Sequence, residues 1–405
     1  MYQSERNIYI VNQHYYPELA STGQVFQEIA EHYQKNGYRV TVIAGKPFYH
    51  DHDIDNPPAE QVINDVAVKR LWNTAFHKAS FVGKLFNLLT FQISLLFFLL
   101  FSLPAGSLIM VGTNPPMAIM SVTKLKHIKK FRVIFVVQDL YPDILISSNL
   151  IKEIDFKYIL LKALMKKSFH LSDTIITISH DMKTRIEANY GCKNVVLICN
   201  WSIGNIYPLD NMLLKSNKGW DGKFVVQYSG NFGIAHEYET LLSSVRKLKS
   251  KDDILFYIVG GGVNFNKLKT ICEKEGLKNI VFSNYVSKEE LNENLNISDI
   301  SLVVFNDDFK HVLLPSKYYG LLACAKPILL ISNGENDISR DIHVYNTGFF
   351  IQSGHSDELI NVIIQLSGDR ELIGVLSQNA YALFREKYQK EKILAQYLEV
   401  VKKYE

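Results

Sequence analysis

The chain has 405 residues, 47% of them hydrophobic, and a formal net charge of +3 at pH 7. This length predicts two or three domains with large cores, and so small a charge gives no argument for a nucleic-acid partner. The four cysteines form no CxxC pair, so we expect reduced thiols in the cytoplasm. The amino terminus runs directly into an apolar strand, so we also expect no targeting segment before the fold.

Strands and helices alternate along the first half of the chain. Residues 7–12 and 38–44 read as two strands, joined by a long loop that ends at Gly23 and a helix at 24–36. Further strands are expected at 107–112, 131–137, 174–178 and 195–199. Open α/β sheets bind ligands at the carboxyl ends of parallel strands, so we expect the first loop to contact a ligand. The first strand is not followed by G-x-G-x-x-G, which argues against a dinucleotide site.

The polar stretch 48–58 contains residue types that can bind a metal. It contains His50, Asp51, His52, Asp53 and Asp55. Nothing in the pattern fixes a ligand geometry, so a solvated loop is expected there and no metal site.

Residues 85–104 form the most hydrophobic run of the chain. A bilayer-spanning helix takes about 20 apolar residues, but four polar residues interrupt the first half of this run. We expect a helix that lies in one leaflet, with a buried core helix and a true span as the alternatives. Lysines and arginines precede and follow the run, which suits the anionic inner face of a cell membrane. The expected membrane contacts are Leu95, Leu96, Phe97, Phe98, Leu99 and Leu100.

The strand at 131–137 is followed by Asp139. This is where an α/β enzyme places a catalytic or substrate-holding carboxylate. The alternative is a helix cap, because aspartate caps helices well and Pro142 favours a turn.

The second half repeats the alternation after a change in composition. Residues 203–222 lack periodicity and contain glycine, proline and asparagine, so we expect a linker there. The sequence therefore predicts an α/β protein with two mostly parallel sheets, in Rossmann-like domains at 1–202 and 223–379. A charged amphipathic helix at 380–405 is long enough to return from the second domain to the first.

Lys317 is the most informative residue of the second half. It stands in the first turn of an expected helix, after Pro315 and Ser316. A cation there is unfavourable unless an anion joins it, and helix N-termini bind phosphate readily. The alternative is a lysine that reaches solvent and has no role. Glycine-bearing loops at 230–233 and 260–262 would let backbone amides approach the same phosphates in a cleft between the domains, without a metal.

Six segments in order carry a family resemblance over nearly the whole chain. They are YYPELASTG at 15–23, VQDLYPD at 137–143, NW at 200–201, YSGNFG at 228–233, GGG at 260–262 and LPSKYYGLLACAKPIL at 314–329. In this order they resemble family-4 glycosyltransferases of the GT-B fold. The resemblance is to the bacterial branch that builds O-antigen, capsule and exopolysaccharide, including the fucosamine-transferring and colanic-acid-type enzymes.

The resemblance implies two Rossmann-like domains that face each other across a cleft, with the last helix returning to the first domain. It implies transfer of a hexose or N-acetylhexosamine from a nucleotide diphosphate sugar, with a UDP-sugar favoured. The anomeric configuration would be retained, and neither a metal nor a cofactor would be needed. The acceptor would be a sugar on undecaprenyl diphosphate, which places the protein in the cytoplasm on the inner face of the cell membrane.

The resemblance also assigns roles by position. The Gly23 amide, Ser316 and Lys317 would hold the donor diphosphate, and Gly230 and Asn231 would line the donor cleft.

By the same resemblance, Tyr285 and Val286 would lie near the base. His14 and Asp139 would lie near the reacting sugar and the acceptor.

The chain departs from the family pattern at two places. Many members carry two glutamates, where this chain has Val312 and Gly320. The second loss matters more, because that acid usually holds the ribose; either a ligand approaches Gly320 closely or the ribose contact has moved. His236 and Glu237 replace a Lys-Gly pair, which removes one diphosphate cation.

Two other functions are compatible with the sequence. A nucleotide-sugar epimerase would share the fold, but the apolar run argues against it because that reaction has no lipid substrate. A catalytically degenerate protein that acts as a membrane-associated binding module in polysaccharide assembly would explain the lost glutamates. Measured sugar transfer separates this module from the enzyme.

Overall fold

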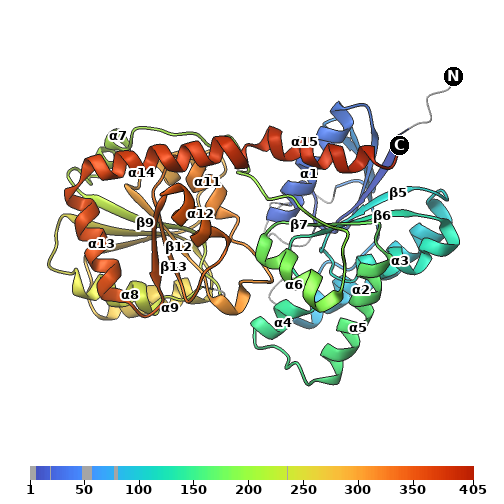
Figure 1. The fold of residues 1–405 in the computed structure, drawn as a ribbon, viewed down its shortest axis with the longest axis horizontal. Coiled ribbons are helices and arrows are strands. Elements are labelled where there is room, and N and C mark those ends of the chain that lie inside the picture. The colour runs from blue at the N-terminus through green and yellow to red at the C-terminus, as the bar shows by residue number, and fades with distance from the viewer. Residues whose placement is uncertain (1–5, 19, 48–56, 77–80, 235) are drawn as a thin grey trace. The chain divides into compact units, whose positions relative to one another are not determined.

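The computed structural model describes residues 6–18, 20–47, 57–76, 81–234 and 236–405. The chain divides into two compact units, coloured along the chain in Figure 1. The first domain comprises Met1–Cys199, His311–Leu313 and Leu394–Glu405, and the second comprises Asn200–Lys310 and Leu314–Ile393. The histidines and aspartates of the polar stretch at 48–56 lie outside the described residues.

The first domain is built on an eight-stranded sheet with the order β3-β4-β2-β1-β5-β6-β7-β8. Its strands are β1 Asn7–Val11, β2 Arg39–Ala44, β3 Glu60–Ile63, β4 Val66–Arg70, β5 Leu108–Val111, β6 Arg132–Val137, β7 Thr174–Thr177 and β8 Val195–Leu197. Its helices are α1 Ser21–Lys35, α2 Phe81–Phe97, α3 Ala118–Lys129, α4 Asp143–Ser147, α5 Phe156–Leu171 and α6 His180–Tyr190, with a π turn at Phe98–Ser102. Only the β3–β4 pair is antiparallel among the paired strands of the described residues.

The second domain is built on a six-stranded parallel sheet with the order β11-β10-β9-β12-β13-β14. Its strands are β9 Phe224–Asn231, β10 Ile254–Gly261, β11 Ile280–Ser283, β12 Ile300–Val304, β13 Ile328–Ser332 and β14 Gly348–Gln352. Its helices are α7 Asn211–Ser216, α8 Glu239–Lys247, α9 Val263–Lys274, α10 Leu291–Asn296, α11 Lys317–Ala323, α12 Asp337–Tyr345, α13 Ser356–Gly368 and α14 Arg370–Leu383. A 3-10 turn lies at Asp307–Phe309 and a π turn at Phe384–Tyr388.

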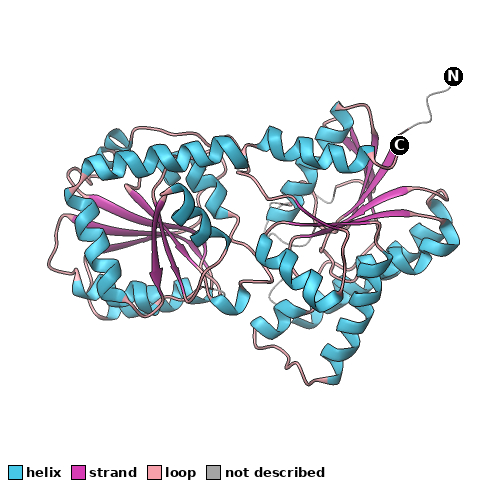
Figure 2. Ribbon diagram, in the orientation of Figure 1, coloured by secondary structure: helices cyan, strands magenta, loops and turns pink. Residues whose placement is uncertain are grey.

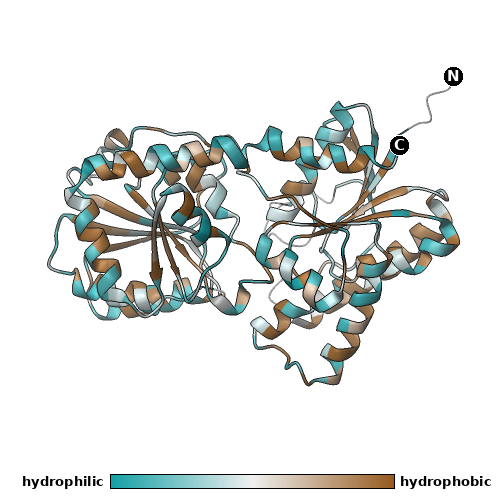
Figure 3. Cartoon of the chain, viewed as in Figure 1, coloured by the Kyte–Doolittle hydropathy of each residue, from teal (hydrophilic) through white to brown (hydrophobic). Residues whose placement is uncertain are grey.

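Helices cover both faces of each sheet, so the central strands are buried on both sides (Figure 2). In β9 and β10, Val226 and Phe256 pack on one face while Val225 and Tyr257 pack on the other. Strands buried in this way read as nearly continuous apolar runs, which Figure 3 shows as brown ribbons in both sheets. The prediction of two Rossmann-like α/β domains with mostly parallel sheets is confirmed.

Three expected boundaries differ from the structure. Helix α1 begins at Ser21, so Gly23 lies in its first turn and not at the end of a loop. The expected linker at 203–222 contains α7 and belongs to the second domain, where Lys215 pairs with Asp299 at 2.6 Å. The expected helix at 380–405 is divided by an extended Gln389, after which α15 covers Lys390–Lys402.

The apolar run folds as α2 and its π turn, with one face on the domain. Among the described residues, one helical segment, Leu85–Ser102, is long enough and apolar enough to cross a membrane. Of this segment, 22% is buried inside the protein. Phe91, Leu95 and Leu99 recur every four residues and are fully buried. The expected membrane contact is therefore wrong for Leu95 and Leu99, which belong to the core.

The remaining expected contacts on α2 stay predictions. Phe97 and Leu100 are exposed, Leu96 and Phe98 are partly buried, and Phe101, which the sequence reading did not single out, is 74% exposed.

The polar residues of α2 attach it to the protein. The Asn87 side chain accepts from the Phe76 amide and donates to the Phe76 carbonyl, both at 2.9 Å. Ser94 Oγ donates to the Trp72 carbonyl at 2.7 Å. These bonds fix the helix against the segment that follows β4.

Candidate functional site

In the second domain, two strands approach each other at glycines. β9 and β10 pair Gly230 with Gly260, and Gly260 has φ +133°. A Cβ on Gly260 would lie 2.1 Å from the Gly230 carbonyl oxygen, so no other residue fits there. A Cβ on Gly262 would lie 2.6 Å from Oδ1 of Asn231. The glycines therefore bring the carboxyl ends of two parallel strands, including Gly230 and Asn231, into close contact.

Lys317 lies beside the Gly230–Gly260 pair, which we call the glycine crossing. Its Nζ atom is 3.6 Å from the centre of the Tyr228 ring, and a Cβ on Gly230 would be 3.4 Å from Nζ. The nitrogen is buried and has no hydrogen-bond partner among the described residues. Burial lowers the pKa of Lys317 well below its ordinary value. A buried ammonium without a carboxylate is costly, and an anionic ligand would offset that cost.

His236 occupies the place where the family resemblance implied a cation. Its ring lies 6.0 Å from Tyr228 and 5.8 Å from Phe232, centre to centre, in edge-on contacts. Burial, assisted by the Lys317 charge, lowers the pKa of His236 to about 3, so the ring is neutral at pH 7. Asn264 Nδ2 donates to the His236 carbonyl at 2.8 Å and fixes this loop. Lys317 is thus the cation that this side of the site offers.

Tyr285 and Val286 line a polar cavity of about 510 Å³ after β11. Its other lining residues include Lys218, Glu293 and Asn294. The Tyr285 hydroxyl lies 3.5 Å from Oδ1 of Asn231, so the cavity adjoins the glycine crossing. The cavity thus combines an aromatic wall with several hydrogen-bonding side chains.

Ser316 and Gly320 flank Lys317 on α11. Ser316 is exposed just before the helix. A Cβ on Gly320 would lie 3.5 Å from Leu295 Cδ1 and 3.7 Å from Ser202 Oγ, which are ordinary contacts. Packing within the protein therefore does not require glycine at this place.

In the first domain, His14 follows β1 and is held by its neighbours. Its Nδ1 lies 2.6 Å from Oε2 of Glu18, and both residues are buried. Asn12 Nδ2 donates to the His14 carbonyl at 2.6 Å. A Cβ on Gly23 would lie 3.2 Å from the same carbonyl, so glycine lets α1 start close to His14.

Asp139 follows β6, which is separated from β1 by β5 alone. Burial raises the pKa of Asp139 to about 6. The next amide, of Leu140, donates to the Val312 carbonyl at 2.8 Å. The first missing glutamate is thus a buried valine whose backbone supports the segment of Asp139.

Each domain gathers its own set of the expected residues. Gly230, Asn231 and Lys317 come together in the second domain, with Tyr285 and Val286 in the adjoining cavity. His14 and Gly23 come together in the first domain, and Asp139 lies at the same edge of the sheet.

The sequence reading missed the aromatic side of the lysine site. Tyr228 and Phe232 stack with their ring centres 4.3 Å apart, and His236 packs against both. The available signal was the aromatic pair within YSGNFG, four residues apart, with Tyr228 inside β9 and Phe232 directly after it.

Two known families match the two halves of the chain. Residues 22–201 match "Glycosyltransferase Family 4" and residues 213–383 match "Glycosyl transferases group 1". The chain is 25% identical over 329 residues to the putative colanic acid biosynthesis glycosyl transferase WcaI of Escherichia coli, covering 78% of this chain and 80% of the other. It is 25% identical over 248 residues to the probable glycosyltransferase WbjE of Pseudomonas aeruginosa. That match spans 60% of this chain and 62% of the length of the relative.

Solved structures share the fold over the whole chain. Sucrose-phosphate synthase from Thermosynechococcus elongatus has a TM-score of 0.78 at 14% identity, with 98% of each chain covered. Anabaena HepE in complex with UDP and glucose has a TM-score of 0.69 at 14% identity, with 98% of this chain and 100% of the other covered. The two family matches and the names of the relatives agree on the class of enzyme. The chain is therefore a glycosyltransferase with the GT-B fold.

Proposed function

We propose that this enzyme transfers a hexose or N-acetylhexosamine from a nucleotide diphosphate sugar, with a UDP-sugar favoured, to a sugar on undecaprenyl diphosphate. The reaction retains the anomeric configuration, needs no metal, and serves the synthesis of a surface polysaccharide such as O-antigen or capsule. The second domain binds the donor, and the first domain holds the acceptor at the inner face of the cell membrane.

The observation that carries the donor site is the buried, unpartnered nitrogen of Lys317 beside Gly230. A diphosphate placed against Nζ would pair with it and restore its charged form. The neighbouring cavity lined by Tyr285 and Val286 is the place for the nucleoside. The solved structure of HepE, which shares this fold, supports the assignment, because it contains bound UDP.

The proposed reaction requires stabilisation of the negative charge that develops on the leaving group. The bond from the anomeric carbon to the diphosphate oxygen breaks, and the nucleoside diphosphate leaves with the electron pair. The acceptor oxygen then bonds to the anomeric carbon, and its proton passes to the departing diphosphate. A fixed cation aimed at the leaving group lowers this barrier, so Lys317 does the work that a metal does elsewhere.

In the first domain, the proposed acceptor residues are His14 and Asp139. Glu18 orients the His14 ring, and a pKa near 6 leaves Asp139 ionised at neutral pH. An ionised carboxylate in this place can accept a hydrogen bond from a sugar hydroxyl. The exposed apolar face of α2 would dock on the membrane that carries the acceptor.

A transfer assay tests this proposal. Purified enzyme is given UDP-glucose, UDP-galactose, UDP-N-acetylglucosamine or UDP-N-acetylgalactosamine, with undecaprenyl-diphosphate-linked N-acetylglucosamine in vesicles and a chelator. The expected result is one glycosylated lipid product, whose anomeric proton coupling matches that of the donor. Binding of a nucleotide sugar without transfer to any lipid-linked sugar would instead favour the degenerate binding module.

A further inference from the structure

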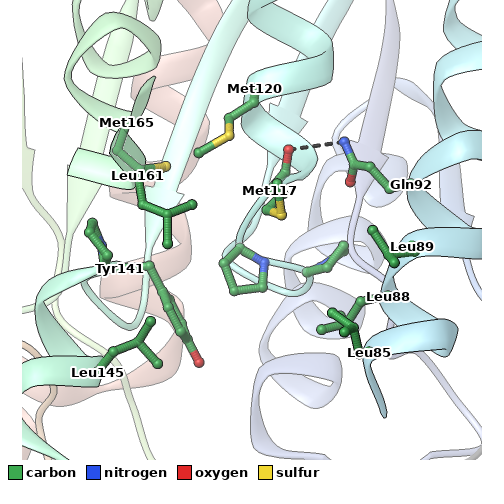
Figure 4. Close-up of a pocket in the computed structure, with 13 residues that line it drawn as sticks. Leu85, Leu88, Leu89, Gln92, Met117, Met120, Tyr141, Leu145, Leu161 and Met165 are labelled. Atoms are coloured by element: carbon green, nitrogen blue, oxygen red, sulfur yellow. Dashed lines mark hydrogen bonds between the residues drawn. The ribbon is translucent and has the colours of Figure 1, made fainter. Parts of the chain in front are cut away.

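The first domain contains an apolar cavity, which is separate from the proposed donor site in the second domain. It has a volume of about 220 Å³ and lies between α2, α3, α4 and α5. Figure 4 shows Leu161 and Met165 of α5 facing Leu85, Leu88 and Leu89 of α2 across it. The walls are almost wholly apolar. Water would form few hydrogen bonds in this cavity, whereas burial of a hydrocarbon chain there would be favourable.

Two polar side chains, Gln92 and Tyr141, lie on the cavity wall. The amide oxygen of Gln92 is buried and has no hydrogen-bond partner among the described residues, whereas its amide nitrogen is engaged. Gln92 Nε2 donates to the Met117 carbonyl at 3.0 Å, drawn as a dashed line in Figure 4. The same nitrogen also donates to Ser121 Oγ. The ring of Tyr141 faces the cavity. The pKa of Tyr141 is raised, mainly by burial and to a smaller extent by the negative charge of Asp139.

The cavity begins at the edge of the sheet that carries the proposed acceptor residues. Tyr141 and Pro142 form part of its wall and follow Asp139 by two and three residues. Pro115 forms another part, and the carbonyl of Asn114 before it accepts from the Gln13 amide at 2.6 Å, next to His14. A chain in the cavity would therefore have one end near both His14 and Asp139.

The rim of the cavity continues into exposed apolar surface. On α2, Phe86, Leu89 and Ile93 are exposed, and on α5 Ile159 and Phe156 are exposed, the last by 75%. A monomer rarely leaves so much adjoining apolar surface without a partner.

Charge on α5 indicates which partner this is. The helix carries four lysines and no acidic residue. Lys157, Lys166 and Lys167 are exposed, and Lys162 lies 5.3 Å from the centre of the Tyr158 ring. Cations beside an apolar face suit an anionic membrane lipid better than a neutral protein surface.

We propose that this cavity binds the first isoprene units of the polyprenyl chain of the acceptor, while α2 and α5 dock together on the bilayer. The proposal rests on the proposed function, because it names the part of the lipid-linked acceptor that the first domain recognises. It makes the cavity a substrate-selecting subsite: a chain seated there delivers the diphosphate-linked sugar to His14 and Asp139.

Direct binding tests the site. The probes are farnesyl diphosphate and isopentenyl diphosphate, which share a diphosphate and differ by ten carbons. Each methylene that leaves water strengthens binding about fourfold, so burial of four of the ten predicts at least about 100-fold tighter binding of the farnesyl compound. Equal affinity for the two probes would overturn the proposal.

Variants that fill the cavity test whether the isoprenoid chain binds in it. Leu161→Trp and Leu145→Trp fill it from two different helices, and each should weaken farnesyl diphosphate binding at least about tenfold. Ile159→Trp is the matched control, because this residue is exposed on α5 and does not line the cavity; its affinity should match that of the wild type. Thermal unfolding confirms that each variant is folded. Wild-type affinity in both cavity variants would contradict the proposal.

A vesicle arm separates the acceptor chain from ordinary membrane lipid. Vesicles of phosphatidylcholine and phosphatidylglycerol without isoprenoid should bind the wild type, Leu161→Trp and Leu145→Trp equally. Loss of this binding in both cavity variants would show that an acyl chain of the bilayer is the occupant, and would overturn the proposal.

Sugar transfer separates this proposal from the proposed function. If the wild type glycosylates a lipid-linked sugar but binds both diphosphates equally, the subsite fails and the function stands. If it prefers farnesyl diphosphate by the expected factor, loses that preference in both cavity variants and transfers no sugar, the function fails and the subsite stands.

Discussion

The side-chain nitrogen of Lys317 lies 3.6 Å from the centre of the Tyr228 ring and has no hydrogen-bond partner among the described residues. The ring faces the nitrogen and supplies only a weak, diffuse attraction in place of a carboxylate. A buried lysine without a partner favours an anionic ligand, and under the proposed function this ligand is the donor diphosphate.

Removing this cation should abolish most of the activity. Lys317→Ala is expected to lower kcat at least about 100-fold, the usual scale for the loss of one group that stabilises a leaving anion. Lys249→Ala is the control, because Lys249 is an exposed lysine of the same domain, after α8. Initial rates with the preferred donor measure both. A Lys317→Ala enzyme with near-normal kcat would refute the role.

Asp139 should make stability depend on pH. Burial raises its folded-state pKa to about 6, whereas an unfolded aspartate titrates near pH 4. The folded state therefore holds this proton more tightly, so the free energy of unfolding falls as the pH rises from about 4 to about 6 and stays at its lower value above pH 6. Asp139→Asn should raise the free energy of unfolding at pH 7 by up to about 2 kcal/mol and lose turnover. Its advantage should shrink as the pH falls from 6 to 4.

Urea unfolding of the wild type and Asp139→Asn at pH 7, 5.5 and 4.5 measures this difference. A difference that stays constant over the range would show that the carboxyl group is not buried as described.

Two glycine replacements should act in opposite directions. Gly260→Ala forces a Cβ against the Gly230 carbonyl at φ +133°, and should cost about 3 kcal/mol or more. Gly320→Ala meets only ordinary contacts inside α11, and should stabilise by up to about 1 kcal/mol. Denaturant unfolding compares the two. The pair tests the geometry of the site without any substrate, and a destabilised Gly320→Ala would contradict it.

The exposed face of α2 should hold the protein on membranes. Phe97 and Phe101 are 59% and 74% exposed, so replacing both with glutamate should keep the fold and weaken binding to anionic vesicles at least about tenfold. Leu95→Glu should instead unfold the first domain, because Leu95 is buried. Val344→Glu, an exposed valine of the second domain, is the control. Vesicle sedimentation that finds the double variant bound like the wild type would locate the docking surface elsewhere.

The sequence predicted most of the strands and the class of fold, because buried parallel strands are continuous apolar runs with glycine-bearing ends. It gave no expectation for β3, β4 or β14, which are short strands at or next to the edges of the two sheets. The predicted start of α1 was three residues too late, because Ser21 and Thr22 are common both in loops and at the first positions of helices. It did not show which face of α2 is buried, because leucine and phenylalanine occur all round that helix. Phe91, Leu95 and Leu99 face inward through contacts with the rest of the domain, which a local pattern does not contain.

The candidate site was predictable residue by residue but not as an arrangement. Lys317 and Gly230 were expected from their motifs, whereas the contact of Lys317 with Tyr228 joins α11 to a strand 89 residues earlier. The neutral state of His236 likewise depends on burial beside Lys317. The apolar cavity could not be foreseen, because its walls come from four helices that are separated in sequence.

The donor site is tested most directly by the thermal stability of the purified enzyme with UDP, GDP, ADP, CMP or dTDP at millimolar concentration. A ligand at about 100 times its dissociation constant adds roughly 2.7 kcal/mol, which raises the Tm by several degrees. We predict that one nucleoside diphosphate, UDP by preference, raises the Tm of the wild type and leaves that of Lys317→Ala unchanged. A wild type that none of the nucleotides stabilises, or a Lys317→Ala variant that is stabilised equally, would contradict the account.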